Sequence, residues 1–328
     1  RERTIEERLI DSLSRVKGAF SIVMQTADTL IAARDPNGFR PLSLGRLDGA
    51  WIVASETCAL DLIGASFERD IDPGEVVVIR RGRLRTLRPF KSSASERFCI
   101  FEYIYFARPD SNLNGQNVYH YRKELGRLLA REHPVAADLV APVLDSGNTA
   151  ALGYAEESGI PYEQAIIRNH YVRRTFIEPA QSIRHFGVKV KHNAVRGILE
   201  GKRVVLVDDS IVRGTTLIKL VTMLRSAGAT QVHLRISSPP TTGPCRYGID
   251  TPTEEELIAH RHSVEEICEI MGADSLGYLS VSGLSKSAEP LKIGHCDACF
   301  SGNYPVPVEA SEDRPQLSLF RDVSEDGD

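Results

Sequence analysis

The sequence predicts two successive units, an α+β unit built on mostly antiparallel sheet and an α/β unit built on a parallel sheet. Short strand-like runs separated by tight turns fill residues 19–79, a pattern typical of antiparallel sheet. From residue 137 onward, strand-like and helix-like runs alternate, which indicates a parallel sheet covered by helices on both faces. The 328 residues of the chain are enough for two hydrophobic cores.

The first unit opens with an amphipathic helix over residues 4–16, because Ile5, Leu9, Leu13 and Val16 recur at helical spacing. Strands are expected at residues 19–25, 29–34, 42–47, 51–55 and 75–79, and a short helix is expected between residues 55 and 64. The run Pro-Asn-Gly at 36–38 predicts a turn, since Asn and Gly tolerate positive φ. We assign residues 1–90 to this unit.

The polar run KSSASER at 91–97 indicates a linker into the second unit. Strand-like runs follow at 137–144, 162–168, 204–207 and 231–238, with helix-like runs at 149–159 and 215–228. This alternation predicts the parallel sheet of the second unit, which we assign to residues 91–310. Residues 311–328 are acidic and are expected to be a disordered tail.

Composition excludes several classes of function. A net charge of −4 gives no basic footprint for nucleic acid or for an anionic membrane. The chain has neither an apolar run of roughly 20 residues, the length that spans a bilayer, nor a secretory leader, so we expect a cytoplasmic protein. It begins at Arg1 inside a helical pattern, which suggests that the first part of a longer protein is absent.

The stretch VVLVDDSIVRGTT at 204–216 carries the strongest chemical signal. Asp208 and Asp209 follow a buried strand, at the sheet edge where parallel sheets bind ligands. The next helix starts near Thr215, and the free N–H groups of its first turn form an anion cradle. Gly214 lets the backbone approach an anion closely, and the hydroxyls of Thr215 and Thr216 add donors.

A phosphorylated ribose satisfies both halves of this stretch. Its phosphate would lie on Ser210–Thr216, while its hydroxyls or a Mg²⁺ ion would lie on the two carboxylates. The loop is not a Walker A loop, because G-x-x-x-x-G-K-[ST] is absent. The alternative is a strand end whose acids only face water and cap the helix.

This stretch resembles the phosphoribosyl diphosphate (PRPP) loop of type I phosphoribosyltransferases, and in particular that of the glutamine PRPP amidotransferases, which catalyse the first committed step of purine (IMP) synthesis. Nearly the whole chain up to the acidic tail shares the resemblance. The matching stretches are DPNGFRPLSLG (35–45), SETCALD (55–61), FEYIYFARPDSN (101–112), NHYVRRTFIEPAQSIR (169–184), KHNAVRGILEGKRVV (191–205), ISSPPTTGPCRYGIDT (236–251) and CDACFSGNYP (296–305).

The resemblance implies that PRPP and ammonia are converted to 5-phosphoribosylamine and diphosphate. It implies Mg²⁺ on Ser146, Asp208 and Asp209, and a mobile lid at 169–191. Catalytic roles would fall to Asp208, Asp209, Lys191 and Arg174, and Arg168 is one of the other cations near the lid. PRPP itself would contact Asp145, Ser146, Gly147, Asp208, Asp209, Ser210, Val212, Arg213, Gly214, Thr215 and Thr216.

Six cysteines are present, and a cytosolic chain of this size is a poor disulfide candidate. From the residues alone, Cys99, Cys245, Cys296 and Cys299 indicate either zinc or an iron–sulfur cluster. The resemblance implies a structural [4Fe–4S] cluster on these four, as in one branch of the family. Cys58 and Cys268 lie in helix-like apolar surroundings and are expected to be small buried side chains.

The resemblance also implies that the first unit is the C-terminal half of an N-terminal-nucleophile glutaminase domain. The nucleophile of such a domain is an N-terminal Cys, which this chain does not contain. We therefore expect ammonia-dependent activity only. The family further implies a homo-oligomer, often a tetramer, inhibited by purine nucleotides. Two other functions remain open: a PRPP-binding regulator without turnover, and a redox iron–sulfur protein.

Overall fold

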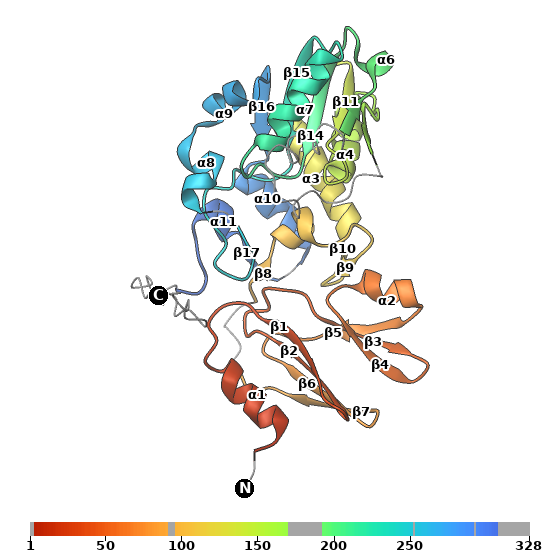
Figure 1. The fold of residues 1–328 in the computed structure, drawn as a ribbon, viewed down its shortest axis with the longest axis vertical. Coiled ribbons are helices and arrows are strands. Elements are labelled where there is room, and N and C mark those ends of the chain that lie inside the picture. The colour runs from red at the N-terminus through yellow and green to blue at the C-terminus, as the bar shows by residue number, and fades with distance from the viewer. Residues whose placement is uncertain (1–2, 91–95, 170–191, 252, 292, 308–328) are drawn as a thin grey trace, which may run out of the picture.

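The computed structural model describes residues 3–90, 96–169, 192–251, 253–291 and 293–307. Two units lie one above the other, the first in red to orange and the parallel-sheet unit in yellow to blue (Figure 1). The predicted acidic tail and the predicted lid, apart from Asn169, lie outside the described residues. None of the helices within the described ranges is long and apolar enough to cross a membrane.

The first unit contains two antiparallel sheets, and a helix packs against one of them (Figure 1). Helix α1 (Ile5–Leu13) starts at a capping box between Thr4 and Glu7, and it covers the first sheet through Leu13. That sheet has the order β1 (Ser21–Gln25), β2 (Thr29–Arg34), β6 (Val76–Arg80), β7 (Arg83–Leu87). The second has the order β4 (Ala50–Ala54), β3 (Ser43–Leu47), β5 (Ser66–Asp70), and α2 (Thr57–Ile63) follows β4. All the predicted strands of this unit are confirmed, whereas β5 and β7 were not predicted.

The second unit contains a four-stranded parallel sheet, which confirms the predicted fold class. Its order is β11 (Leu139–Pro142), β14 (Arg203–Asp208), β15 (Gln231–Ile236), β16 (Ser275–Tyr278). Val205 and Val207 point to the face covered by α3 (Val118–Glu132), α4 (Asn148–Ser158) and α10 (Val281–Ala288). Val204 and Leu206 point to the face covered by α7 (Thr215–Ser226) and α9 (Val264–Met271).

Residues 162–168 depart from the prediction of a full strand in this sheet. Only Tyr162 forms a parallel bridge, to Val140 of the edge strand β11. Beyond it, β12 (Ile166–Arg168) pairs antiparallel with β13 (His192–Ala194). After Tyr162 the chain leaves the parallel sheet, and the backbone of β12 pairs with β13 instead of with β11.

Short elements connect the two units. Strand β8 (Phe98–Cys99) pairs in parallel with β17 (His295–Cys296), so that Cys99 lies opposite Cys296. The other short elements are η1 (Glu102–Phe106, a π-helix), β9 (Asn112–Leu113), β10 (Gln116–Asn117), α6 (Arg196–Leu199), η3 (Glu254–Glu256), α8 (Ile258–Arg261), η4 (Glu289–Leu291) and α11 (Ala298–Ser301).

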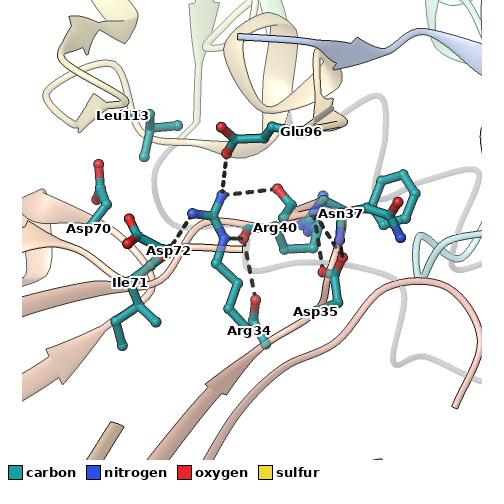
Figure 2. Close-up of polar contacts among 12 residues, drawn as sticks. Arg34, Asp35, Asn37, Arg40, Asp70, Ile71, Asp72, Glu96 and Leu113 are labelled. Atoms are coloured by element: carbon teal, nitrogen blue, oxygen red, sulfur yellow. Dashed lines mark hydrogen bonds and ion pairs between the residues drawn. The ribbon is translucent and has the colours of Figure 1, made fainter. Parts of the chain in front are cut away.

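Arg34 anchors this junction (Figure 2). Its side chain is only 2% exposed and forms an ion pair with Glu96 at 3.4 Å. Its guanidinium also donates to the carbonyls of Gly38 and Arg40, both at 2.9 Å. The turn at 35–41 is thereby held in place, and its Phe39 carbonyl in turn accepts a 2.9 Å hydrogen bond from the N–H of Cys99.

Candidate functional site

The acid pair lies at the carboxyl edge of the parallel sheet. Asp208 is the last residue of β14, and the neighbouring strand β11 runs into the turn at 143–147. The Ser146 hydroxyl donates to Asp208 Oδ1 at 2.8 Å. A Cβ on Gly147 would lie 2.2 Å from the Val207 carbonyl oxygen, so glycine is required for this turn to pack against β14. The predicted convergence of Asp208 and Ser146 is therefore present.

The two carboxylates are strongly perturbed, with Asp208 and Asp209 only 7% and 5% exposed. Burial raises the pKa of Asp208, and the neighbouring charge of Asp209 raises it further. Burial also raises the pKa of Asp209, while the Ser210 hydroxyl and the Arg122 guanidinium act in the opposite direction. Two adjacent buried carboxylates and a hydroxyl form an all-oxygen donor set, which suits Mg²⁺.

The loop after the acids leads into the N-terminus of α7. Gly214 has φ 76° and is the N-cap residue of this twelve-residue helix, with no side-chain capping bond. A Cβ there would lie 2.3 Å from Met271 Cε, so the loop is packed tightly against α9. Thr215 and Thr216 are exposed. The uncapped N–H groups of α7 and these hydroxyls form the cradle expected for a phosphate.

Three other residues predicted to contact PRPP are engaged elsewhere in the structure, two in ion pairs and one in the wall of a cavity. The Arg213 guanidinium forms an ion pair with Glu256 at 3.1 Å. Asp145 forms an ion pair with Arg168. Val212 lines the cysteine cavity described below, and as an apolar residue it could offer an anion only its backbone N–H. Lys191 and Arg174 lie outside the described residues.

Arg122 is a site residue that the sequence did not reveal. It is 6% exposed on α3 and donates to the carbonyls of Tyr103 at 2.8 Å and Ala107 at 2.7 Å. Its charge acts on Asp209 from within the protein. The helical recurrence of Val118, Tyr121, Leu125 and Leu129 could have identified the helix that carries it.

The four predicted ligand cysteines line one cavity between the two units. Cys99 comes from β8, Cys296 from β17, Cys299 from α11, and Cys245 from the loop after β15. Aromatic side chains complete the wall, with Phe39 stacked on Tyr247 at a centroid distance of 4.4 Å. The N–H of Tyr247 donates to Cys245 Sγ at 3.3 Å. By contrast, Cys58 is buried and Cys268 partly buried in helices away from this cavity.

The cavity fits a group larger than water. It measures about 50 Å³, several times the roughly 10–15 Å³ that one water molecule needs, and water would also need polar partners. Burial raises the pKa of Cys99 to about 12 and that of Cys296 to about 11. Within the described ranges, no three His, Cys, Asp or Glu side chains are arranged to hold a single metal ion.

Two family models match the chain in order. One is described as a glutamine amidotransferase domain and matches residues 3–62. The other is described as a phosphoribosyl transferase domain and matches residues 131–238, which include the acid pair and its loop. The two matches fall in the antiparallel and the parallel unit respectively.

Curated and solved relatives agree with these matches. Amidophosphoribosyltransferase of Bacillus subtilis is 53% identical over 309 residues, covering 93% of this chain and 65% of that protein. The structure of B. subtilis glutamine PRPP amidotransferase complexed with ADP and GMP is 52% identical, with a TM-score of 0.87 over 94% of this chain and 69% of that one. A structure described as the allosteric regulatory enzyme of purine biosynthesis is 51% identical, with a TM-score of 0.88 over 94% and 67%. This chain thus spans just under two thirds of the length of the curated B. subtilis relative.

Proposed function

Since the chain belongs to the family of glutamine PRPP amidotransferases, also called amidophosphoribosyltransferases, we propose that it is a pentosyltransferase that makes 5-phosphoribosylamine. The reaction joins ammonia to the anomeric carbon of PRPP and releases diphosphate, at the start of purine synthesis. One observation carries the proposal above the others. The buried pair Asp208–Asp209, held by Ser146, lies directly before the uncapped N-terminus of α7.

This arrangement assigns a part of PRPP to each group. The 5′-phosphate lies on the N–H groups of residues 210–216 and on the hydroxyls of Thr215 and Thr216. The ribose hydroxyls and Mg²⁺ lie on Asp208 and Asp209, with Ser146 as a further ligand of the metal. When bound, Mg²⁺ neutralises the charge that develops on the departing diphosphate. The turn at 145–147 supplies a second set of N–H groups for that diphosphate.

No protein nucleophile is needed, because ammonia itself attacks. The protein holds the anomeric carbon in place and excludes water, which would otherwise hydrolyse PRPP. In the family, cations of the lid would stabilise the leaving diphosphate, and in this chain Arg174 and Lys191 are the proposed candidates. Arg168, which precedes that segment, forms an ion pair with Asp145 of the proposed diphosphate turn.

The cysteine cavity is proposed to hold a [4Fe–4S] cluster on Cys99, Cys245, Cys296 and Cys299. Its role would be structural, because its ligands come from the segment that joins the units and from the C-terminal segment. The convergence of the four thiols and the N–H bond to Cys245 Sγ support this. An electron-transfer role is less well supported, since the aromatic wall and the acid pair offer no second redox group.

We also propose the domain boundaries 1–90 and 91–310, with residues 1–90 as part of a glutaminase domain. We further propose that this chain by itself uses ammonia rather than glutamine. Inhibition by purine nucleotides is proposed by analogy with the relative solved with ADP and GMP, and a homo-oligomer is proposed from the family resemblance alone.

Diphosphate release from PRPP tests the proposal. With Mg²⁺ and ammonium chloride the chain should release diphosphate, and with glutamine in place of ammonium it should not. Release that does not depend on ammonium would indicate hydrolysis and would overturn the assignment. Binding of PRPP without any release would instead favour the alternative, a regulatory protein that senses PRPP.

A further inference from the structure

Two spaces of different character meet at Tyr304. One is the cysteine cavity, whose wall is mainly apolar. The other is a wider polar pocket of about 720 Å³, lined by Arg97, His295, Asp297 and Asn303 among others. Among the described residues, Tyr304 is the one whose side chain lines both spaces. Its ring therefore stands between the polar pocket and the four thiols.

The orientation of this ring is fixed by several contacts. Tyr304 Oη donates to the Pro244 carbonyl at 2.6 Å. The guanidinium of Arg246 lies over the ring, 4.5 Å from its centroid. A Cβ on Gly243 would lie 2.8 Å from Tyr304 Oη, so glycine leaves the space that the phenol occupies. All three contacts come from residues 243–246, the segment that also carries Cys245.

The polar pocket also comes close to two of the four thiols along the chain. Cys296 lies between His295 and Asp297, both of which line the polar pocket. Cys299 lies in α11, and Gly302 at the end of that helix also lines the pocket. Among the described residues, Tyr304 is thus the side chain that borders both the polar pocket and the cavity that holds these two thiols.

We propose that Tyr304 is a shielding residue that controls how fast small polar reagents pass from the polar pocket to the cysteine cavity. The inference goes beyond the proposed synthase activity, and it concerns the free thiols as well as the proposed cluster. Burial also raises the pKa of the Cys299 thiol. A residue that served only as an anchor for the C-terminal segment would affect folding without changing access to particular thiols.

Thiol labelling of the metal-free protein tests the proposal directly. N-ethylmaleimide adds to a thiol by forming a carbon–sulfur bond, while the thiol proton moves to the adjacent carbon and nothing leaves. Peptide mapping by mass spectrometry gives the labelling rate of each cysteine. Cys268, which lies in α9 outside the cavity, is the internal control for general loosening of the protein.

Tyr304→Ala removes the ring, and Tyr304→Phe keeps the ring but loses the bond to Pro244. We expect Tyr304→Ala to speed the labelling of Cys296 and Cys299 by about tenfold, on the basis that access limits the reactivity of buried thiols. Tyr304→Phe should stay within about twofold of the wild type for the same reason. Unchanged rates at Cys296 and Cys299, or an equal rise at Cys268, would overturn the proposal. Tyr304→Leu, which retains an apolar side chain, replaces the alanine variant if the latter does not fold.

A second measurement uses the protein as purified without oxygen. If it carries iron and sulfide, a water-soluble iron chelator should bleach its visible absorbance faster in Tyr304→Ala than in Tyr304→Phe, and equal rates would contradict shielding of the cluster. If no iron is found, the cluster proposal fails, while the labelling experiment still decides the role of Tyr304. The two failures are therefore distinguishable.

Discussion

The Ser146 hydroxyl donates a 2.8 Å hydrogen bond to the Asp208 carboxylate, and this contact joins the ends of two neighbouring parallel strands. Ser146 follows β11, and Asp208 ends β14. The contact orients a buried acid toward the edge of the sheet where the cradle of α7 begins. It is also the contact on which the proposed metal site depends.

Ser146→Ala should weaken the binding of Mg²⁺ and PRPP together. A hydrogen bond to a charged group is worth about 1.5–3 kcal/mol, so KM for PRPP should rise by about ten- to a hundredfold. The matched control is Ser158→Ala, because the Ser158 hydroxyl bonds only at the C-terminal end of α4, donating to the Ala155 carbonyl at 3.5 Å and accepting from the Ile160 N–H at 3.3 Å. Equal KM values for the two variants, measured over a range of Mg²⁺ concentrations, would contradict the role of Ser146.

The raised pKa of Asp208 predicts how binding depends on pH. A proton on this carboxyl competes with Mg²⁺, so binding of Mg²⁺ and PRPP should weaken as the pH falls, beginning well above the ordinary aspartate value of 3.8. More Mg²⁺ should move this acid limb to lower pH. Titration of PRPP affinity against pH at two Mg²⁺ concentrations checks the shift, and coincident curves would argue against a shared site.

The same raised pKa predicts a cost in stability. Without ligand, the folded protein holds its proton above the pH at which the unfolded chain loses it. The contribution of Asp208 to stability is therefore greatest below pH 3.8 and is lost as the pH rises through the folded-state pKa. Asp208→Asn should consequently raise the unfolding temperature at pH 7 in the absence of Mg²⁺. A lower unfolding temperature would mean that the acid is stabilised by partners other than those described.

Gly214→Ala tests whether the shape of the phosphate loop matters. The new Cβ would lie 2.3 Å from Met271 Cε, at a φ of +76° that disfavours alanine. We expect a higher KM for PRPP, and Met271→Ala in the same chain should recover part of it by removing the clash while the backbone strain remains. Full recovery would show that the φ angle is unimportant, and no effect of Gly214→Ala would remove the loop from the site.

The crossing of α3 and α4 gives a prediction about stability alone. A Cβ on Gly126 would lie 1.9 Å from the Ala150 carbonyl oxygen, whereas a Cβ on Gly197 would meet nothing within 4 Å. Gly126→Ala should therefore lower the free energy of unfolding by about 1–3 kcal/mol or more. Gly197→Ala should leave it nearly unchanged. Chemical denaturation of the two variants compares them, and similar stabilities would contradict the close packing of these helices.

The sequence predicted the geometry of the proposed site better than it predicted the supporting structure. Asp208, Gly214 and Thr215 were identified because an apolar strand, two acids and a helix start follow one another within a few residues. Ser146 was identified by resemblance, and the structure brings it to Asp208. Features of this kind can be predicted from the sequence because each depends on residues that are neighbours in the chain.

What the sequence did not predict depends on contacts between distant segments. The edge strands β5 and β7 carry charged, partly exposed side chains with little apolar alternation. The charge of Arg122 acts on Asp209 because α3 packs against one face of the sheet. Val212 lines the cysteine cavity, which is formed by distant segments of the chain. Residues 162–168 have a strand pattern, but the choice between β11 and β13 as partner is a tertiary one.

Equilibrium binding of PRPP in the presence of Mg²⁺ tests the central claim most directly. Isothermal titration should show one site per chain in the wild type, and no detectable binding to the double variant Asp208→Asn with Asp209→Asn. The matched control is Glu156→Gln with Glu157→Gln, an adjacent acid pair whose exposed ion pairs on α4 contribute little; it should bind as the wild type does. Wild-type affinity in the Asp208/Asp209 variant would contradict the assignment of this acid pair to PRPP and Mg²⁺.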